Sequence, residues 1–147
     1  MVYKKYKLKL IKKNIYIYKQ TIANQLNVYI IECLPYVIKK DGRYIFNQTL
    51  SYAGKGAAIK VISTVTSVFI DLRGYALNYT WNTPGVGIFI KSSKNVHVLN
   101  GSNNGLTAAV PGSCTAISIT NTTGLILSRL NIERSIYGVY LNQTKTI

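Results

Sequence analysis

Hydrophobic and polar residues alternate in short segments along most of this chain. In GVGIFIKSSKNVHVLNG at 85–101, the segments GIFIK and VHV alternate, and small polar residues separate them. Alternation over about four to eight residues is typical of a half-buried strand, because successive side chains point to opposite faces. The pattern therefore predicts a protein built from short β-strands, each with one buried face.

These alternating segments repeat at a regular distance. A small residue followed by an apolar–x–apolar pattern occurs in AIKV at 58–61, GIFI at 87–90, AISI at 116–119 and GVYL at 138–141, at spacings of 29, 29 and 22 residues. A second alternating segment follows the first three, as VFIDL at 68–72, VHVLN at 96–100 and LILSRL at 125–130. A period of roughly 20–50 residues indicates a repeat architecture.

The repeats predict which side chains lie above one another if each repeat forms one coil of a solenoid. Equivalent strands then lie side by side, about 4.8 Å apart. The inward positions are Ile59, Val61, Ile88, Ile90, Ile117, Ile119, Val139 and Leu141 on the first strand, and Val68, Ile70, Val96, Val98, Leu125 and Leu127 on the second. The outward positions are Lys60, Phe89, Ser118 and Tyr140 on the first strand, and Phe69, His97 and Ile126 on the second.

Several segments resemble a known family. FIDLRGYAL, GVGIFIKSSKNVHVLNGS and YGVYLNQT resemble the rungs of right-handed parallel β-helix repeat proteins of the pectate-lyase-like superfamily, which occur in bacteria and large DNA viruses. The lead-in VIKKDGRYIF is similar to the opening of such proteins. The resemblance covers residues 35–147 and implies an all-β fold, a right-handed parallel β-helix (β-solenoid) of about four coils, one for each repeat. It implies no single activity, because this fold carries lyases, hydrolases, adhesins and tailspikes.

Residues 1–34 lie outside the resemblance and form a basic, Tyr/Lys-rich N-terminal segment, with 7 of the 18 basic residues and 5 of the 12 tyrosines. KLKL and IYIYK alternate as strands do, whereas 20–34 fits a short amphipathic helix with Ile22, Leu26 and Ile30 on one face. Three interpretations stay open for this segment: a cap or extra strands, a basic arm for a partner, or disorder. We expect two parts, 1–34 and a β-helix domain at 35–147.

The fourth repeat starts at Gly138, and the given sequence stops one strand later. We therefore expect either that the β-helix is truncated at its C-terminal end, or that another chain covers this end. The second interpretation predicts a homo-oligomer or end-to-end association.

The charge balance adds candidate partners. The chain is 48% hydrophobic, as globular proteins are, and carries 18 basic against 4 acidic residues, a net charge of +14. Such a surface attracts nucleic acid, anionic lipid or acidic glycans.

No apolar run approaches the about 18 residues that span a membrane, and the start lacks the apolar stretch of a signal peptide. Cys33 and Cys114 are either two thiols or one bridge.

The acidic residues argue against an enzyme. Lyases of the resembled class hold calcium with an acidic cluster, and hydrolases use grouped carboxylates. Asp41 lies in a Lys-Asp-Gly turn between two predicted strands, and Asp71 is expected to point outward beside Arg73. Neither these two nor Glu32 and Glu133 are predicted to converge. His97, the only histidine, lacks metal-binding partners. We expect no catalytic residue, no metal and no cofactor.

The outward aromatic residues are the candidate binding site. The candidates are Phe69, Phe89 and Tyr140, with Trp81 in a loop and His97 on the second strand. Two interpretations stay open: these side chains stack against sugar rings, or the longer loops or residues 1–34 cover some of them. We expect a non-catalytic structural or binding module that recognises glycans or another protein on a virion or cell surface. The alternatives are a protein related to polysaccharide lyases or hydrolases, and a nucleic-acid-binding protein that uses its basic N-terminal segment.

Overall fold

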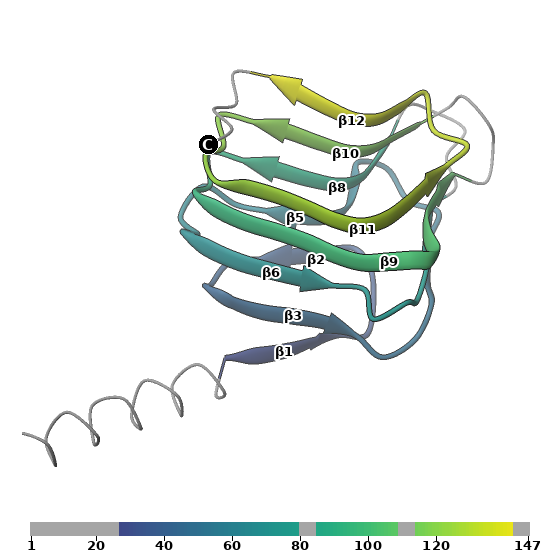
Figure 1. The fold of residues 1–147 in the computed structure, drawn as a ribbon, viewed down its shortest axis with the longest axis horizontal. Helices are drawn as coiled ribbons and strands as arrows, with labels where there is room; N and C mark the ends of the chain where they lie inside the picture. Colours follow the sequence, from purple (N-terminus) through teal and green to yellow (C-terminus); the bar gives the residue numbers. More distant parts are fainter. Residues whose placement is uncertain (1–26, 80–84, 109–113, 143–147) are drawn as a thin grey trace, which may run out of the picture.

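The computed structural model describes residues 27–79, 85–108 and 114–142 (Figure 1). These residues form an all-β structure of parallel strands and contain no helix. The strands are β1 Val28–Ile31, β2 Tyr36–Ile38, β3 Gly42–Phe46, β4 Leu50–Tyr52, β5 Ala57–Val61, β6 Ser67–Asp71, β7 Leu77–Tyr79, β8 Gly85–Lys91, β9 Asn95–Ala108, β10 Cys114–Thr120, β11 Leu125–Glu133 and β12 Tyr137–Asn142.

The strands form two parallel sheets. The chain passes back and forth between them, except that β3 and β4, and also β6 and β7, follow one another within the same sheet. The seven-stranded sheet has the order β1-β3-β6-β9-β7-β4, with β11 also paired to β9. The five-stranded sheet has the order β12-β10-β8-β5-β2. β9 is long enough to pair with β6 through its first residues and with β7 through its last. Figure 1 shows the strands of both sheets stacked in successive layers, an arrangement compatible with a β-helix or solenoid.

The register agrees with the repeats read from the sequence. Ile59 pairs with Ile88, Ile88 with Ile117, and Ile117 with Val139. On the second strand, Val68 pairs with Val96, and Val96 with Leu125. The predicted stacking of equivalent residues is therefore confirmed. Equivalent residues stack because the repeats are 29 residues apart and side chains alternate between the two faces of a strand every residue, so the same positions of each repeat face the core.

The core follows the predicted inward positions except in the last layer of strands, where Leu125 and Leu127 on β11 are only half-buried and two residues on β12 are exposed. The inward residues of β5, β6, β8 and β10 and the start of β9 are fully buried. Val139 and Leu141 on β12 are exposed, although they occupy the same inward positions. They are exposed because no further strand among the described residues covers β12, so the expectation that they are buried is wrong.

The corners between strands are built from small polar residues, as the sequence predicts. Ser92 and Asn121 occupy equivalent corners and both adopt a positive φ, 53° and 50°. The next residues, Ser93 and Thr122, are buried, and their hydroxyls donate to backbone carbonyls, that of Thr122 to Thr120 O at 3.2 Å. Short hydroxyl side chains thus satisfy backbone acceptors where the chain turns.

The helix expected within 20–34 is wrong for Val28–Ile31, which form β1 and pair with β3. The reason is tertiary packing, since Tyr29 stacks on Tyr44 with ring centroids 4.8 Å apart and Ile31 is fully buried. The strands expected in KLKL and IYIYK lie outside the described residues. The division of the chain near residue 35 stays a prediction, although β1 belongs to the same sheet as β3.

Candidate functional site

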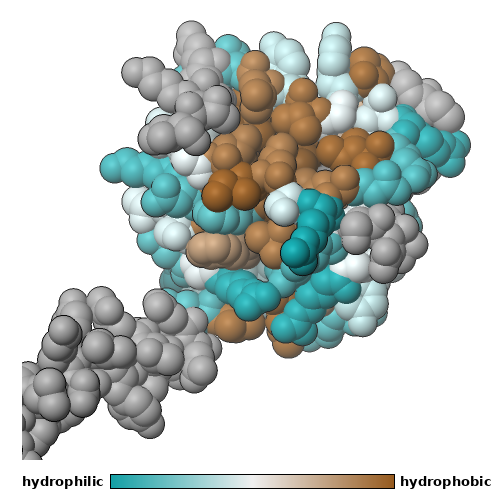
Figure 2. Space-filling model, viewed as in Figure 1, coloured by the Kyte–Doolittle hydropathy of each residue, from teal (hydrophilic) through white to brown (hydrophobic). Residues whose placement is uncertain are grey.

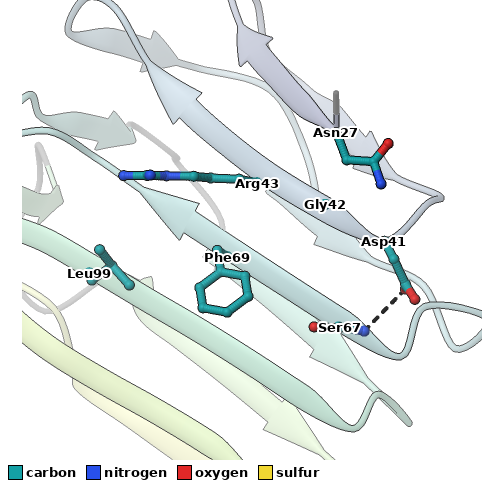
Figure 3. Close-up of a pocket in the computed structure, with 7 residues that line it drawn as sticks. All are labelled: Asn27, Asp41, Gly42, Arg43, Ser67, Phe69 and Leu99. Carbon is teal, nitrogen blue, oxygen red and sulfur yellow. Dashed lines mark hydrogen bonds between the residues drawn. The ribbon is translucent and has the colours of Figure 1, made fainter. Parts of the chain in front are cut away.

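A groove lies on the outer face of the seven-stranded sheet, where β3, β6 and β9 run side by side (Figure 3). Its volume is about 650 Å³. Side chains of several kinds meet there: an aromatic ring, an arginine, a carboxylate, an amide and an aliphatic chain. The lining residues are Asn27, Asp41, Gly42, Arg43, Ser67, Phe69 and Leu99.

Phe69 and His97 form an aromatic pair in the column that borders the groove. They are register partners on β6 and β9, and their ring centroids lie 4.3 Å apart at 31°. Phe69 is 39% exposed, and His97 is half-buried. Ile126 on β11 continues the same column and is exposed. The stacked repeats therefore bring these two predicted site residues into contact.

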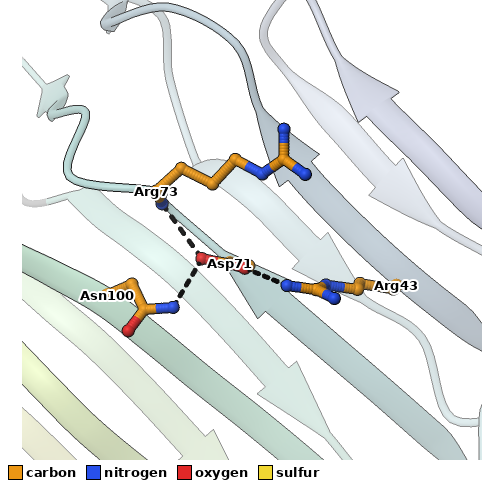
Figure 4. A network of polar contacts seen from close by, with 4 residues as sticks. All are labelled: Arg43, Asp71, Arg73 and Asn100. Atoms are coloured by element: carbon orange, nitrogen blue, oxygen red, sulfur yellow. Dashed lines mark hydrogen bonds and ion pairs between the residues drawn. The ribbon is translucent and has the colours of Figure 1, made fainter.

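Arg43 extends this column on the other side of Phe69, its register partner. Its guanidinium Nη2 donates to Asp71 Oδ2 at 2.5 Å, which gives an ion pair between a half-exposed arginine and a buried carboxylate. Asp71 Oδ1 also accepts from the backbone N–H of Arg73 at 3.0 Å and from Asn100 Nδ2 at 2.9 Å (Figure 4). Asp71 thus anchors Arg43 at the edge of the groove.

Burial by itself raises the pKa of Asp71, but the hydrogen bonds from Arg43, Asn100 and Arg73 outweigh it and hold the pKa below its ordinary value. Asp71 keeps the outward alternation of Phe69 and bonds the outward Arg43, but it is only 2% exposed. The expected surface contact with the Arg73 side chain is wrong, because Arg73 contributes its backbone N–H. The ion-pair partner, Arg43, lies one coil earlier. The repeats aligned from residue 58 onward did not reach that coil, so nothing in them indicated Arg43.

Asp41 closes one end of the groove and lies in the turn between β2 and β3, as predicted. These two strands flank the turn but belong to different sheets. Its Oδ1 accepts from Thr66 N at 2.7 Å and Ser67 N at 3.1 Å, and its Oδ2 accepts from Thr66 Oγ1 at 2.6 Å. The hydrogen bond from the Thr66 hydroxyl is the largest reason why the pKa of Asp41 is lowered. The carboxylate therefore ties the first coil to the start of β6.

The lowered pKa values of Asp41 and Asp71 predict a loss of stability in acid. A carboxyl group whose pKa is depressed by folding stabilises the fold above its unfolded pKa of about 3.9, and this contribution disappears as the pH falls through the folded pKa. We expect a melting temperature that changes little from neutral pH to about 5 and falls below about 4. Asp71→Asn should flatten that fall when melting is followed by circular dichroism. An equally steep fall in Asp41→Asn and Asp71→Asn together would contradict this assignment.

The other predicted site residues lie elsewhere. Phe89 and Tyr140 are both on the outer face of the five-stranded sheet, in one column with Ser118 between them. Phe89 is half-buried and Tyr140 is exposed. Trp81 lies outside the described residues. The structure therefore separates the predicted aromatic set into a Phe69–His97 pair and a Phe89–Tyr140 column on different sheets.

The described acidic residues do not form a pair across the groove. Asp41 precedes Ile45, the register partner of Asp71, by four residues, which is about 13 Å along the strand. Paired glycosidase carboxylates lie about 5–9.5 Å apart. Glu133 accepts a hydrogen bond from Asn131 on β11, at 2.6 Å. Among the described residues, no three of the His, Cys, Asp and Glu side chains are grouped so that they could hold a metal ion.

Comparisons of the chain with protein-family models, with curated proteins and with solved structures find no match. Cys33 is exposed and Cys114 is buried, and neither forms a disulfide. In the part of the chain that the structure describes, no helix has the length and apolar character that a membrane crossing requires.

Proposed function

We propose that this protein is a non-catalytic binding module with a right-handed parallel β-helix of about four coils, which recognises a glycan on a virion or cell surface. The parallel pairing of like residues and the return to each sheet after one repeat support the β-helix. The single observation that carries the binding function is the groove beside the exposed Phe69 ring and its partner His97.

The groove contains an aromatic ring and hydrogen-bond donors and acceptors, the groups that bind a sugar ring. A sugar ring presents an apolar C–H face, which packs on an aromatic ring, and hydroxyl groups, which need donors and acceptors. Phe69 supplies the exposed ring. Arg43 uses one of its N–H groups on Asp71, and Asp41 and Ser67 add oxygen atoms. A volume of about 650 Å³ lies within the ordinary range of ligand pockets.

The local charges favour a ligand without a high negative charge. Arg43 is already paired with the ionised Asp71, and Asp41 adds a further negative charge to the groove. Stacking and hydrogen bonds therefore hold the glycan, and the net charge of +14 contributes little at this place. Binding to nucleic acid, the alternative, would depend on that net charge and would weaken steeply with salt.

The carboxylates favour binding over cleavage. A glycosidase needs a protonated acid, whose pKa is raised, together with a base or nucleophile. The pKa values of Asp41 and Asp71 are both lowered, and the oxygens of both carboxylates already accept hydrogen bonds within the protein. This supports a binding module rather than a lyase or hydrolase.

The test is a glycan-array screen followed by calorimetry on the best ligand at low and high salt. Phe69→Ala should weaken binding about tenfold, the effect of losing one aromatic contact worth ~1.4 kcal/mol. Phe89→Ala removes a ring from the other sheet and should leave the affinity unchanged, so it is the matched control. Absence of glycan binding, equal losses in both variants, or release of sugar fragments would each refute the proposal.

A further inference from the structure

One end of the stack of strands is strongly apolar. Six large hydrophobic side chains on β11, on β12 and in the turn between them are each at least 38% exposed. They are Ile126, Ile136, Tyr137, Val139, Tyr140 and Leu141. Figure 2 shows a broad hydrophobic surface over this end of the molecule. A continuous apolar surface of this kind marks an interaction site more often than scattered apolar residues do.

The same end has two open strand edges. Among the described residues, β12 pairs only with β10, and β11 pairs only with β9. Each free edge presents a row of backbone N–H and C=O groups that another strand can pair with. Ile117 and Ile119, one layer below Val139 and Leu141, are fully buried. One more layer would bury Val139 and Leu141 in the same way.

The opposite end has matching edges. Within the described ranges, β1 pairs only with β3 in the seven-stranded sheet, and β2 pairs only with β5 in the five-stranded sheet. Their outward residues Val28, Ile30 and Val37 are exposed. The outward columns run from Val28 to Ile126 on one sheet and from Val37 to Tyr140 on the other. Both columns therefore have an apolar residue at each end.

We propose that the β11–β12 end of one molecule binds the β1–β2 end of a second copy of this chain, head to tail. All strands within the described residues are parallel, so β1 of the second copy can lie on β11, and its β2 on β12, without a change of direction. Val28 would then meet Ile126, and Val37 would meet Tyr140. This contact continues the coil-on-coil interface that already joins β10 to β12 and β9 to β11.

The chain order supports the head-to-tail direction. After β12 in the five-stranded sheet, the next layer would add a strand on β11 in the other sheet, and β1 precedes β2 in the same order. A head-to-tail contact does not close on itself, so it generates open chains of copies. Because each copy carries +14, repulsion opposes growth, and assembly should increase with protein concentration and with salt.

Sedimentation velocity of the full chain over a range of concentrations and salt tests this proposal. Wild type should form larger species as either rises. Leu141→Lys, at an inward position of one end, should weaken association about tenfold or more, because a charge must be buried. Val37→Lys, at an outward position of the other end, should also weaken association, because it removes the apolar contact of Val37 with Tyr140. Tyr75→Lys changes an exposed hydrophobic residue between β6 and β7, away from both ends, and should assemble as wild type does.

Mixing the two end variants gives the decisive result. Leu141→Lys keeps an intact β1–β2 end, and Val37→Lys keeps an intact β11–β12 end, so an equimolar mixture should form dimers and no longer chains. Misfolded variants could not regain association in this way. Wild type that stays monomeric at every concentration would overturn the proposal. So would Val37→Lys that dimerises alone, since two β11–β12 ends would then bind each other. Neither result depends on glycan binding.

Discussion

Gly87→Ala is expected to lower the free energy of unfolding by about 3 kcal/mol, the upper end of the usual cost of overpacking. A methyl group at Gly87 would lie 2.6 Å from the backbone oxygen of Ala116 and 3.0 Å from Cε1 of Tyr79. Both neighbours are held in place. Ala116 belongs to the buried strand β10, and the fully buried Tyr79 shares a hydrogen bond of 2.7 Å with Ser135 Oγ. The strands must therefore separate to admit the methyl group.

Gly138→Ala is the matched control, because Gly138 occupies the equivalent position of the last repeat. Its added methyl group would meet only Ile132 Cγ2, at 3.6 Å, an ordinary van der Waals contact. We expect a change of less than about 1 kcal/mol there. Chemical denaturation followed by far-UV circular dichroism measures both variants. If Gly87→Ala is as stable as Gly138→Ala, the close packing of Tyr79 and β10 around Gly87 is incorrect.

Asp71→Ala is expected to lower the free energy of unfolding by about 2–3 kcal/mol, below the 3–5 kcal/mol lost when a fully buried ion pair is broken. The cost is smaller because the Arg43 side chain is 52% exposed and water can solvate it after the change. It remains substantial because Asn100 and the backbone N–H of Arg73 also lose their acceptor.

A double-mutant cycle with Arg43→Ala separates these contributions. The coupling energy between Arg43 and Asp71 should be about 1 kcal/mol, less than the full effect of Asp71→Ala, since that variant also breaks two further hydrogen bonds. Urea denaturation of the wild type, both single variants and the double variant gives the four values. If the two single effects simply add, the Arg43–Asp71 ion pair does not stabilise the fold.

The sequence by itself determined the two repeated strands of each coil from residue 58 onward and their register. Alternation with a period of two fixes which face of a strand is apolar, and the 29-residue spacing fixes which residue lies above which, as the column Ile59–Ile88–Ile117 shows. These are properties of local order along the chain. For the same reason the pairing of Phe69 with His97 was predictable, since both occupy the same outward position of successive repeats.

Only the tertiary structure decided the surroundings of those columns. Asp71 has the outward spacing of a surface residue, yet Arg43 and Asn100, from the neighbouring coils, bond it in a buried place. Phe89 shares the outward alternation of Phe69 but lies on the other sheet, because a corner separates the two strands of each repeat. Val139 has the inward pattern of Ile117 but stays exposed, because burial requires a neighbouring layer and periodicity alone cannot supply one.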